Sequence, residues 1–170
     1  IVLEVCHAGD GGMFVLFTSH AALRRVAALL QHELEARWPL LVQGSSPREA
    51  LLRRFREAGN AVLLGTDSFW EGVDVPGRAL RALVLTKLPF KVPSEPITQA
   101  RLERLAEQGE DGFTGYLLPH AALKLKQGFG RLIRSTADVG VVLLLDRRVV
   151  TKRYGGVILE GLPPAERADA

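Results

Sequence analysis

Two arginines and a glutamine recur at helical spacing late in the chain. At about 100° per residue, Gln127, Arg131 and Arg134 fall on one narrow stripe of a helix. The opposite face carries apolar residues, namely Ala122, Leu125, Phe129 and Leu132. Gly128 and Gly130 each cost on the order of 1 kcal/mol relative to alanine inside a helix, so a helix selected only for packing would tend to avoid them. Glycines beside arginines make sense where a large ligand approaches the backbone closely. A solvated helix face is the alternative interpretation.

A second candidate site is the loop that follows the apolar run at residues 61–64. Glu71 and Asp74 lie three residues apart around Gly72, and carboxylates at the end of a parallel strand suit hydrogen bonds to a ribose or to arginine. Ser68, in the same loop, suits donation to a phosphate. Single residues of the loop have simpler explanations, as core or turn residues; these are Phe69, Trp70 and Asp67.

Apolar runs alternate with helical segments along the chain, and these elements must position both candidate sites. The runs lack polar alternation, which is typical of strands covered on both faces of a mostly parallel sheet. They cover residues 13–18, 39–43, 61–64, 82–85 and 141–145. Helical spacing follows the first run, and a capping-box pattern beginning at Ser46 opens a helix after the second. We therefore predict an α/β sandwich, in which ligands bind beyond the carboxyl ends of the strands.

Composition places few limits on function. The chain has 170 residues, of which 47% are hydrophobic and 24% charged, and this suits one globular domain with a substantial core. No apolar stretch approaches the roughly 20 residues that span a bilayer. Cys6 is the single cysteine, which excludes an internal disulfide and four-thiolate ligation of an iron–sulfur cluster within the chain and favours a cytoplasmic protein. A net charge of +3 permits a polyanionic partner without requiring one.

The two candidate sites resemble motifs of superfamily 2 helicases. The run QGFGRLIRS resembles the Q-x-x-G-R-x-x-R form of motif VI in DinG and XPD proteins, and SFWEGVD resembles the DinG form of motif V. The resemblance implies a RecA-like three-layer α/β/α domain that serves as the second motor domain of an ATP-dependent DNA helicase. Arg134 would then be the catalytic arginine finger, Arg131 would hold the γ-phosphate, and Gln127 would couple nucleotide to DNA.

The same resemblance implies further contacts on both sides of the domain. Glu71, Gly72 and Asp74 would face the nucleotide together with the two arginines, and Ser68 would face DNA. Segments similar to other helicase motifs add candidate DNA contacts at Thr18, Ser19, Gln43 and Gly44, and a proline-stiffened loop at residues 87–93 matches the KLPF-x-x-P segment of DinG proteins. Thr18 and Ser19 are equally explained as helix caps, and a glutamine before a glycine turn is common.

The resemblance covers residues 12–163, with residues 1–11 interpreted as the tail of a preceding element and residues 164–170 as a flexible tail. The chain contains neither a G-x-x-x-x-G-K-[ST] run nor a D-E-x-H run. ATP and Mg²⁺ would therefore be held mainly by a first motor domain outside this sequence, where any iron–sulfur cluster would also lie. We expect an isolated monomer without ATPase activity, and single-stranded DNA and that first domain as partners. The family resemblance further suggests 5′ to 3′ movement.

Two other functions stay open at this point. A RecA-like domain without a motor role would serve as a docking module for nucleic acid or protein. A nucleotide-dependent transferase on a Rossmann-like sheet is the third possibility, although the G-x-G-x-x-G fingerprint is absent. An upstream phosphate loop and D-E-x-H run in the full reading frame would favour the motor over the docking module.

Overall fold

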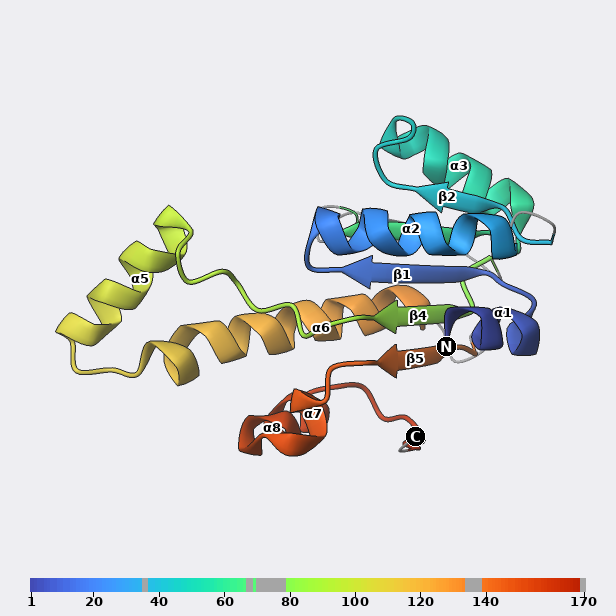
Figure 1. Ribbon diagram of the computed structural model, residues 1–170. Helices are drawn as coiled ribbons and strands as arrows, with labels where there is room; N and C mark the ends of the chain where they lie inside the picture. The colour runs from blue at the N-terminus through green and yellow to red at the C-terminus, as the bar shows by residue number, and fades with distance from the viewer. Residues whose placement is uncertain (35–36, 67–68, 70–78, 134–138, 169–170) are drawn as a thin grey trace. The chain divides into compact units, whose positions relative to one another are not determined.

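A computed structural model of the chain describes residues 1–34, 37–66, 69, 79–133 and 139–168. Its described residues form a parallel sheet of five strands in the order β2-β3-β1-β4-β5 (Figure 1). The strands are β1 Met13–Phe17, β2 Leu40–Val42, β3 Val62–Thr66, β4 Ala82–Leu85 and β5 Val141–Leu144. The helices are α1 Val2–Gly9, α2 His20–Leu34, α3 Arg48–Ala58, α5 Pro96–Glu107, α6 Leu118–Leu132, α7 Arg148–Thr151 and α8 Arg153–Glu160, with a π-helix, η1, at Phe113–Leu117.

The predicted α/β class is confirmed, and each predicted strand exists within two residues of its predicted ends. Every pairing that involves a central strand is parallel; Met13, for example, lies opposite Val62 on one side and Ala82 on the other. Both β1 and β3 are buried along their whole length, and apart from Gly65 and Thr66 at the end of β3 they carry large apolar side chains throughout.

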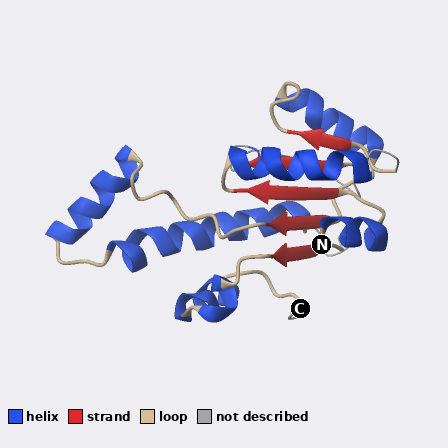
Figure 2. Ribbon diagram, in the orientation of Figure 1, coloured by secondary structure: helices blue, strands red, loops and turns tan. Residues whose placement is uncertain are grey.

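The structure groups the chain into two compact units, the first made of residues 1–87 and 130–146 and the second of residues 88–129 and 147–170. In the first unit, alternate β1 residues face opposite layers. Met13, Val15 and Phe17 pack in one core with α1 and α2, whereas Phe14 contacts Phe55 of α3, with ring centroids 4.6 Å apart. Helices therefore cover both faces of this sheet (Figure 2).

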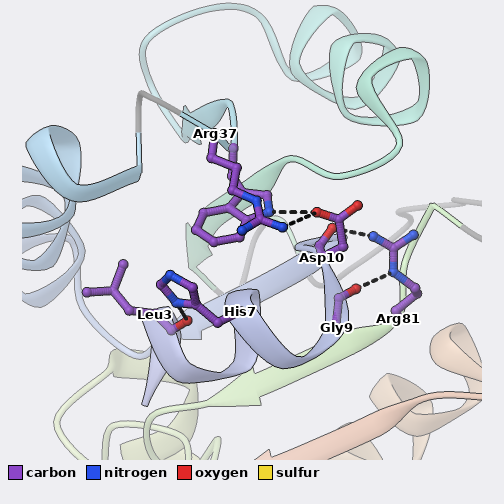
Figure 3. Close-up of polar contacts among 7 residues, drawn as sticks. Leu3, His7, Gly9, Asp10, Arg37 and Arg81 are labelled. Atoms are coloured by element: carbon purple, nitrogen blue, oxygen red, sulfur yellow. Dashed lines mark hydrogen bonds and ion pairs between the residues drawn. The ribbon is translucent and has the colours of Figure 1, made fainter.

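Residues 1–11, interpreted from sequence as the tail of a preceding element, include helix α1. Its Cys6 is fully buried in the core of the first unit. The turn after α1 is held by polar contacts (Figure 3): Arg81 donates from Nε to the carbonyl oxygen of Gly9 over 3.1 Å, and Trp38 donates from Nε1 to Asp10 Oδ1 over 3.2 Å. Gly11 follows with a φ of +72° and lies directly against the Asn60 backbone.

The second unit is helical and is stabilised by its own aromatic cluster. Phe90, Phe113 and Tyr154 come from three separate segments, and their ring centroids lie 5.1 to 5.8 Å apart. The guanidinium of Arg148 lies 5.3 Å from the centroid of the Phe90 ring. The divisions predicted from sequence at residues 11/12 and 163/164 stay predictions. Within the described residues, no helix combines the length and apolar character needed to cross a membrane.

Candidate nucleotide and nucleic-acid interface

The carboxyl ends of β1, β2 and β3 meet at one edge of the sheet, because the three strands are parallel neighbours. Polar residues stand at each end: Thr18 and Ser19 after β1, Gln43 after β2, and Thr66 as the last residue of β3. The fold thus brings two of the predicted DNA-contacting segments to the same edge, together with the strand end that precedes the third. Such an edge is where open α/β sheets bind ligands.

Gln43 connects two strand ends at this edge. Its side-chain oxygen Oε1 accepts a hydrogen bond from the backbone N–H of Thr66 over 2.6 Å and another from the Thr66 hydroxyl over 3.0 Å. Thr66 is only 6% exposed, so these bonds satisfy groups that have little access to water. The Oε1 atom of Gln43 therefore positions the end of strand β3, where the segment predicted from sequence as a loop begins. Sequence reasoning predicted Gln43 as a DNA contact and missed Thr66 as its partner.

Of the segment predicted as a loop after β3, Phe69 is a residue whose environment the structure describes. It is 4% exposed, which favours the simpler interpretation of this side chain as a core residue. A Cβ atom added to Gly65 would lie 2.8 Å from Phe69 Cβ, so glycine at this strand position lets the aromatic ring pack against the backbone. The guanidinium of Arg48 lies 5.7 Å from the centroid of the Phe69 ring. No sequence signal connected Arg48 to this loop.

Ser19 caps helix α2. Its hydroxyl oxygen accepts a hydrogen bond from the backbone N–H of Ala22 over 3.2 Å, and its carbonyl oxygen accepts one from Leu23. The structure therefore supports the alternative prediction that Ser19 is a helix cap. Ser19 and Thr18 are both exposed at the edge of the sheet. Gly44 has a φ of +95°, and an added Cβ would meet no atom within 4 Å. The backbone conformation, rather than a close neighbour, therefore favours glycine at that turn.

Helix α6 carries the glutamine of the arginine stripe. Leu125 and Leu132 are buried, as predicted for the apolar face, whereas Gln127 is exposed. A Cβ atom added to Gly130 would meet nothing within 4 Å, so this stretch of α6 backbone is open to an approaching group. Arg131 is the next residue of the helix, which ends at Leu132.

Several predicted site residues fall where no position is described. Ser68, Glu71, Gly72, Asp74 and Arg134 lie outside the described residues, as does the side chain of Arg131. Their predicted roles therefore rest on the sequence. In the ranges for which the structure gives positions, no group of three or more histidine, cysteine, aspartate or glutamate residues is arranged to hold a metal ion.

Comparison with known proteins identifies the family to which this chain is similar. Residues 2–165 match the helicase C-terminal domain family. The chain is 44% identical over 163 residues to the ATP-dependent DNA helicase YoaA of Escherichia coli, covering 96% of this chain and 25% of that protein. It is 38% identical to the ATP-dependent helicase DinG of Mycobacterium tuberculosis, covering 96% of this chain and 24% of the relative. The chain thus spans about a quarter of the length of these relatives.

Solved structures agree on the fold. An XPD helicase superposes with a TM-score of 0.71 at 23% identity, covering 94% of this chain and 29% of that one. Xpd4 of S. tokodaii superposes with a TM-score of 0.64 at 21% identity, covering 88% and 29%. The match over nearly the whole chain, the DinG-type relatives and the shared parallel sheet lead to one assignment: this chain belongs to the helicase C-terminal domain family, as the C-terminal helicase domain of a DinG/XPD-like helicase.

Proposed function

We propose that residues 12–163 act as the second motor domain of an ATP-dependent DNA helicase that moves 5′ to 3′ on single-stranded DNA. The observation that carries the proposal is the meeting of three motif-bearing segments at one carboxyl edge of a parallel sheet, in a chain of the helicase C-terminal domain family. Relatives named ATP-dependent DNA helicases support the reaction class. A nucleotide site between two domains needs residues from both of them, so this single RecA-like domain would supply one side of the proposed site.

On the nucleotide side, we propose that Arg134 acts as the arginine finger and Arg131 holds the γ-phosphate. ATP and Mg²⁺ would be held mainly by a first motor domain elsewhere in the same protein, and bound ATP would supply the phosphoanhydride that is cleaved. The open backbone at Gly130 and the exposed amide of Gln127 fit the approach of a phosphate group to α6. Guanidinium groups suit this position because they stay charged and present a planar fork of donors to phosphate oxygens.

The carboxylates of Glu71 and Asp74 around Gly72 are proposed to orient the arginines or the ribose. This would connect the nucleotide to the loop that begins at Thr66. Because Gln43 Oε1 accepts hydrogen bonds from both the N–H and the hydroxyl of Thr66, the proposed loop has a fixed starting point at the sheet edge. A change in this loop would then be passed to the ends of β2 and β3.

On the DNA side, we propose that Thr18, Ser19, Gly44 and Ser68 contact the phosphates of single-stranded DNA. Exposed hydroxyls at the amino end of α2 suit this task, since each can donate its hydrogen to a phosphate oxygen and the start of a helix favours an anion. Such contacts would be salt-sensitive and would not read base sequence. Gln43 is proposed to act on DNA indirectly, through the position of Thr66.

The experiment that tests this function compares the full-length protein with the isolated chain. We expect ATP hydrolysis by the full-length protein to rise on addition of single-stranded DNA, and the isolated chain, a monomer, to show none. A full-length protein that neither hydrolyses ATP nor binds single-stranded DNA would refute the motor function and favour a docking module. Steady turnover by the isolated chain would refute the division of the site between two domains.

A further inference from the structure

The second compact unit contains a cavity of about 440 Å³ that the proposed motor function does not use. It lies between helix α5 and the π-helix η1, which pack against each other. Six residues line it: Arg101, Arg104, Leu105, Gln108, Gly115 and Tyr116. The volume falls within the range of small-ligand sites and suits one nucleotide-sized group.

The cavity wall formed by α5 is cationic. At about 100° per residue, Arg101, Arg104 and Gln108 fall within an arc of roughly 60° on one side of the helix. Glu103 falls on another side, where its carboxylate accepts a hydrogen bond from Gln99 over 2.8 Å. Arg101, Arg104 and Gln108 thus line the cavity, while the carboxylate of Glu103 is hydrogen-bonded on another side of the helix.

Arg101 is held in place by an aromatic ring. Its guanidinium carbon lies 5.4 Å from the centroid of the Tyr116 ring. A guanidinium that lies over a ring face can still donate from the N–H groups along its own edges. The contact also limits the rotamers of the arginine before an anion binds, which lowers the entropy cost of binding. Among the described residues, no carboxylate lies within ion-pair distance of Arg101 or Arg104.

Two acids that follow α5 in the sequence have separate places. The Asp111 carboxylate lies at the start of η1: it accepts hydrogen bonds from the Thr114 hydroxyl and from the backbone N–H groups of Thr114 and Phe113, and these bonds lower the Asp111 pKa. Glu110 lies at the Gly115 side of the cavity, with Oε2 3.9 Å from the position of a Cβ on that glycine. Glu110 therefore opposes an anion, and the two arginines favour one.

We propose that this cavity is a separate phosphate-binding site for single-stranded DNA, in which Arg101, Arg104 and Gln108 donate to one phosphodiester and Tyr116 positions Arg101. The choice of DNA as the source of the phosphate rests on the proposed function. The site lies on α5 and η1, apart in sequence from every segment assigned to the sheet-edge interface. It would extend the DNA-binding surface of the domain to its helical unit.

The test measures single-stranded DNA binding by the full-length protein at 50 and 200 mM salt, using fluorescence anisotropy of a labelled oligonucleotide. Loss of one phosphate contact should reduce the slope of log K against log salt by about 0.7. We compare Arg101→Gln with Arg104→Gln to the wild-type protein and take 1 M salt as the point where the two bind equally. The slope change then corresponds to about eightfold weaker binding at 50 mM, roughly 1.3 decades below 1 M, and to about threefold weaker binding at 200 mM, roughly 0.7 decades below it.

Four further variants isolate the site. Arg53→Gln with Arg56→Gln removes the same two charges at the same helical spacing from α3 and should leave the slope unchanged. Glu110→Gln should strengthen binding. Tyr116→Phe keeps the ring under Arg101 and should bind as wild type, whereas Tyr116→Leu, checked for folding by circular dichroism, should weaken binding.

The outcomes separate the two proposals. A wild-type protein that does not bind single-stranded DNA refutes the proposed function. A wild-type protein that binds, with the Arg101 and Arg104 variant unchanged in affinity and slope, refutes this site alone. An equal loss in the α3 control would show that net charge, rather than the cavity, sets the affinity, and this also overturns the proposal.

Discussion

Substitution of Gln43 by alanine should destabilise the domain by about 2 kcal/mol. The change removes the acceptor of two hydrogen bonds, one of 2.6 Å from the Thr66 N–H and one of 3.0 Å from its hydroxyl. Thr66 is 6% exposed, so its donors would lose their partner in a place that water reaches poorly. Leaving buried groups unsatisfied costs about 1 to 3 kcal/mol, and for a domain of this size each kcal/mol lowers Tm by about 2 to 4 °C.

Urea unfolding of the chain, followed by circular dichroism, measures this free energy. Gln43→Glu keeps an oxygen acceptor at the same reach and should retain most of the stability lost in Gln43→Ala. Gln31→Ala, at an exposed position on α2, controls for glutamine truncation and should change the free energy of unfolding by less than about 0.5 kcal/mol. If Gln43→Ala is as stable as the Gln31 control, the contact with Thr66 does not hold the strand ends together.

Other predictions concern the core and the nucleotide. Gly11→Ala should lower the free energy of unfolding by more than about 3 kcal/mol, because the added Cβ would press on the Asn60 carbonyl and lie 2.7 Å from Trp38 Cδ1. Gly59→Ala is the control: Gly59 has a φ of +70° and an added Cβ would meet no atom within 4 Å, so this change should cost about 1 kcal/mol for backbone strain alone. Equal losses of the two variants in urea unfolding would contradict the close approach at Gly11. Burial raises the pKa of the Cys6 thiol from 9.0 to about 11, which lowers the fraction of reactive thiolate at pH 8. A thiol reagent at pH 8 should therefore modify the folded chain on the order of 100-fold more slowly than the urea-unfolded chain. Comparable rates would show that Cys6 is accessible. Because the folded state favours the neutral thiol, the stabilisation linked to Cys6 should be complete below about pH 9 and lost as pH rises through about 11. The isolated chain should release little heat on titration with ATP in a calorimeter, and micromolar affinity would contradict the placement of the main ATP-binding groups in another domain.

The strands and the sheet class could be predicted from sequence because buried parallel strands have a direct signature. Residues 61–64 and 82–85 are apolar without interruption, and that pattern requires cover on both faces. The apolar face of α6 was predictable for the same kind of reason, since Leu125 and Leu132 recur with the helical period.

The elements that sequence reasoning missed depend on tertiary context. Helix α1 is short, and the burial of Cys6 comes from its packing with α2 and the sheet rather than from local periodicity. The pairing of Gln43 with Thr66 joins residues 23 positions apart, and nothing in either segment alone indicates its partner. The cavity beside Arg101 likewise depends on how α5 meets η1, a contact that no pattern along one helix can report.

The central claim, that this chain supplies an arginine finger to ATP held by another domain, is tested most directly by the turnover of Arg134→Lys in the full-length protein. Lysine keeps the charge but replaces the planar fork, so DNA-stimulated kcat should fall by roughly 10³ to 10⁵, with a smaller change in KM and an unchanged fold. Arg131→Lys is measured beside it to divide the roles of the two arginines, and Arg153→Lys on α8 serves as an exposed control with wild-type turnover. Near-wild-type kcat for Arg134→Lys would contradict the claim and leave Arg134 as part of a solvated surface.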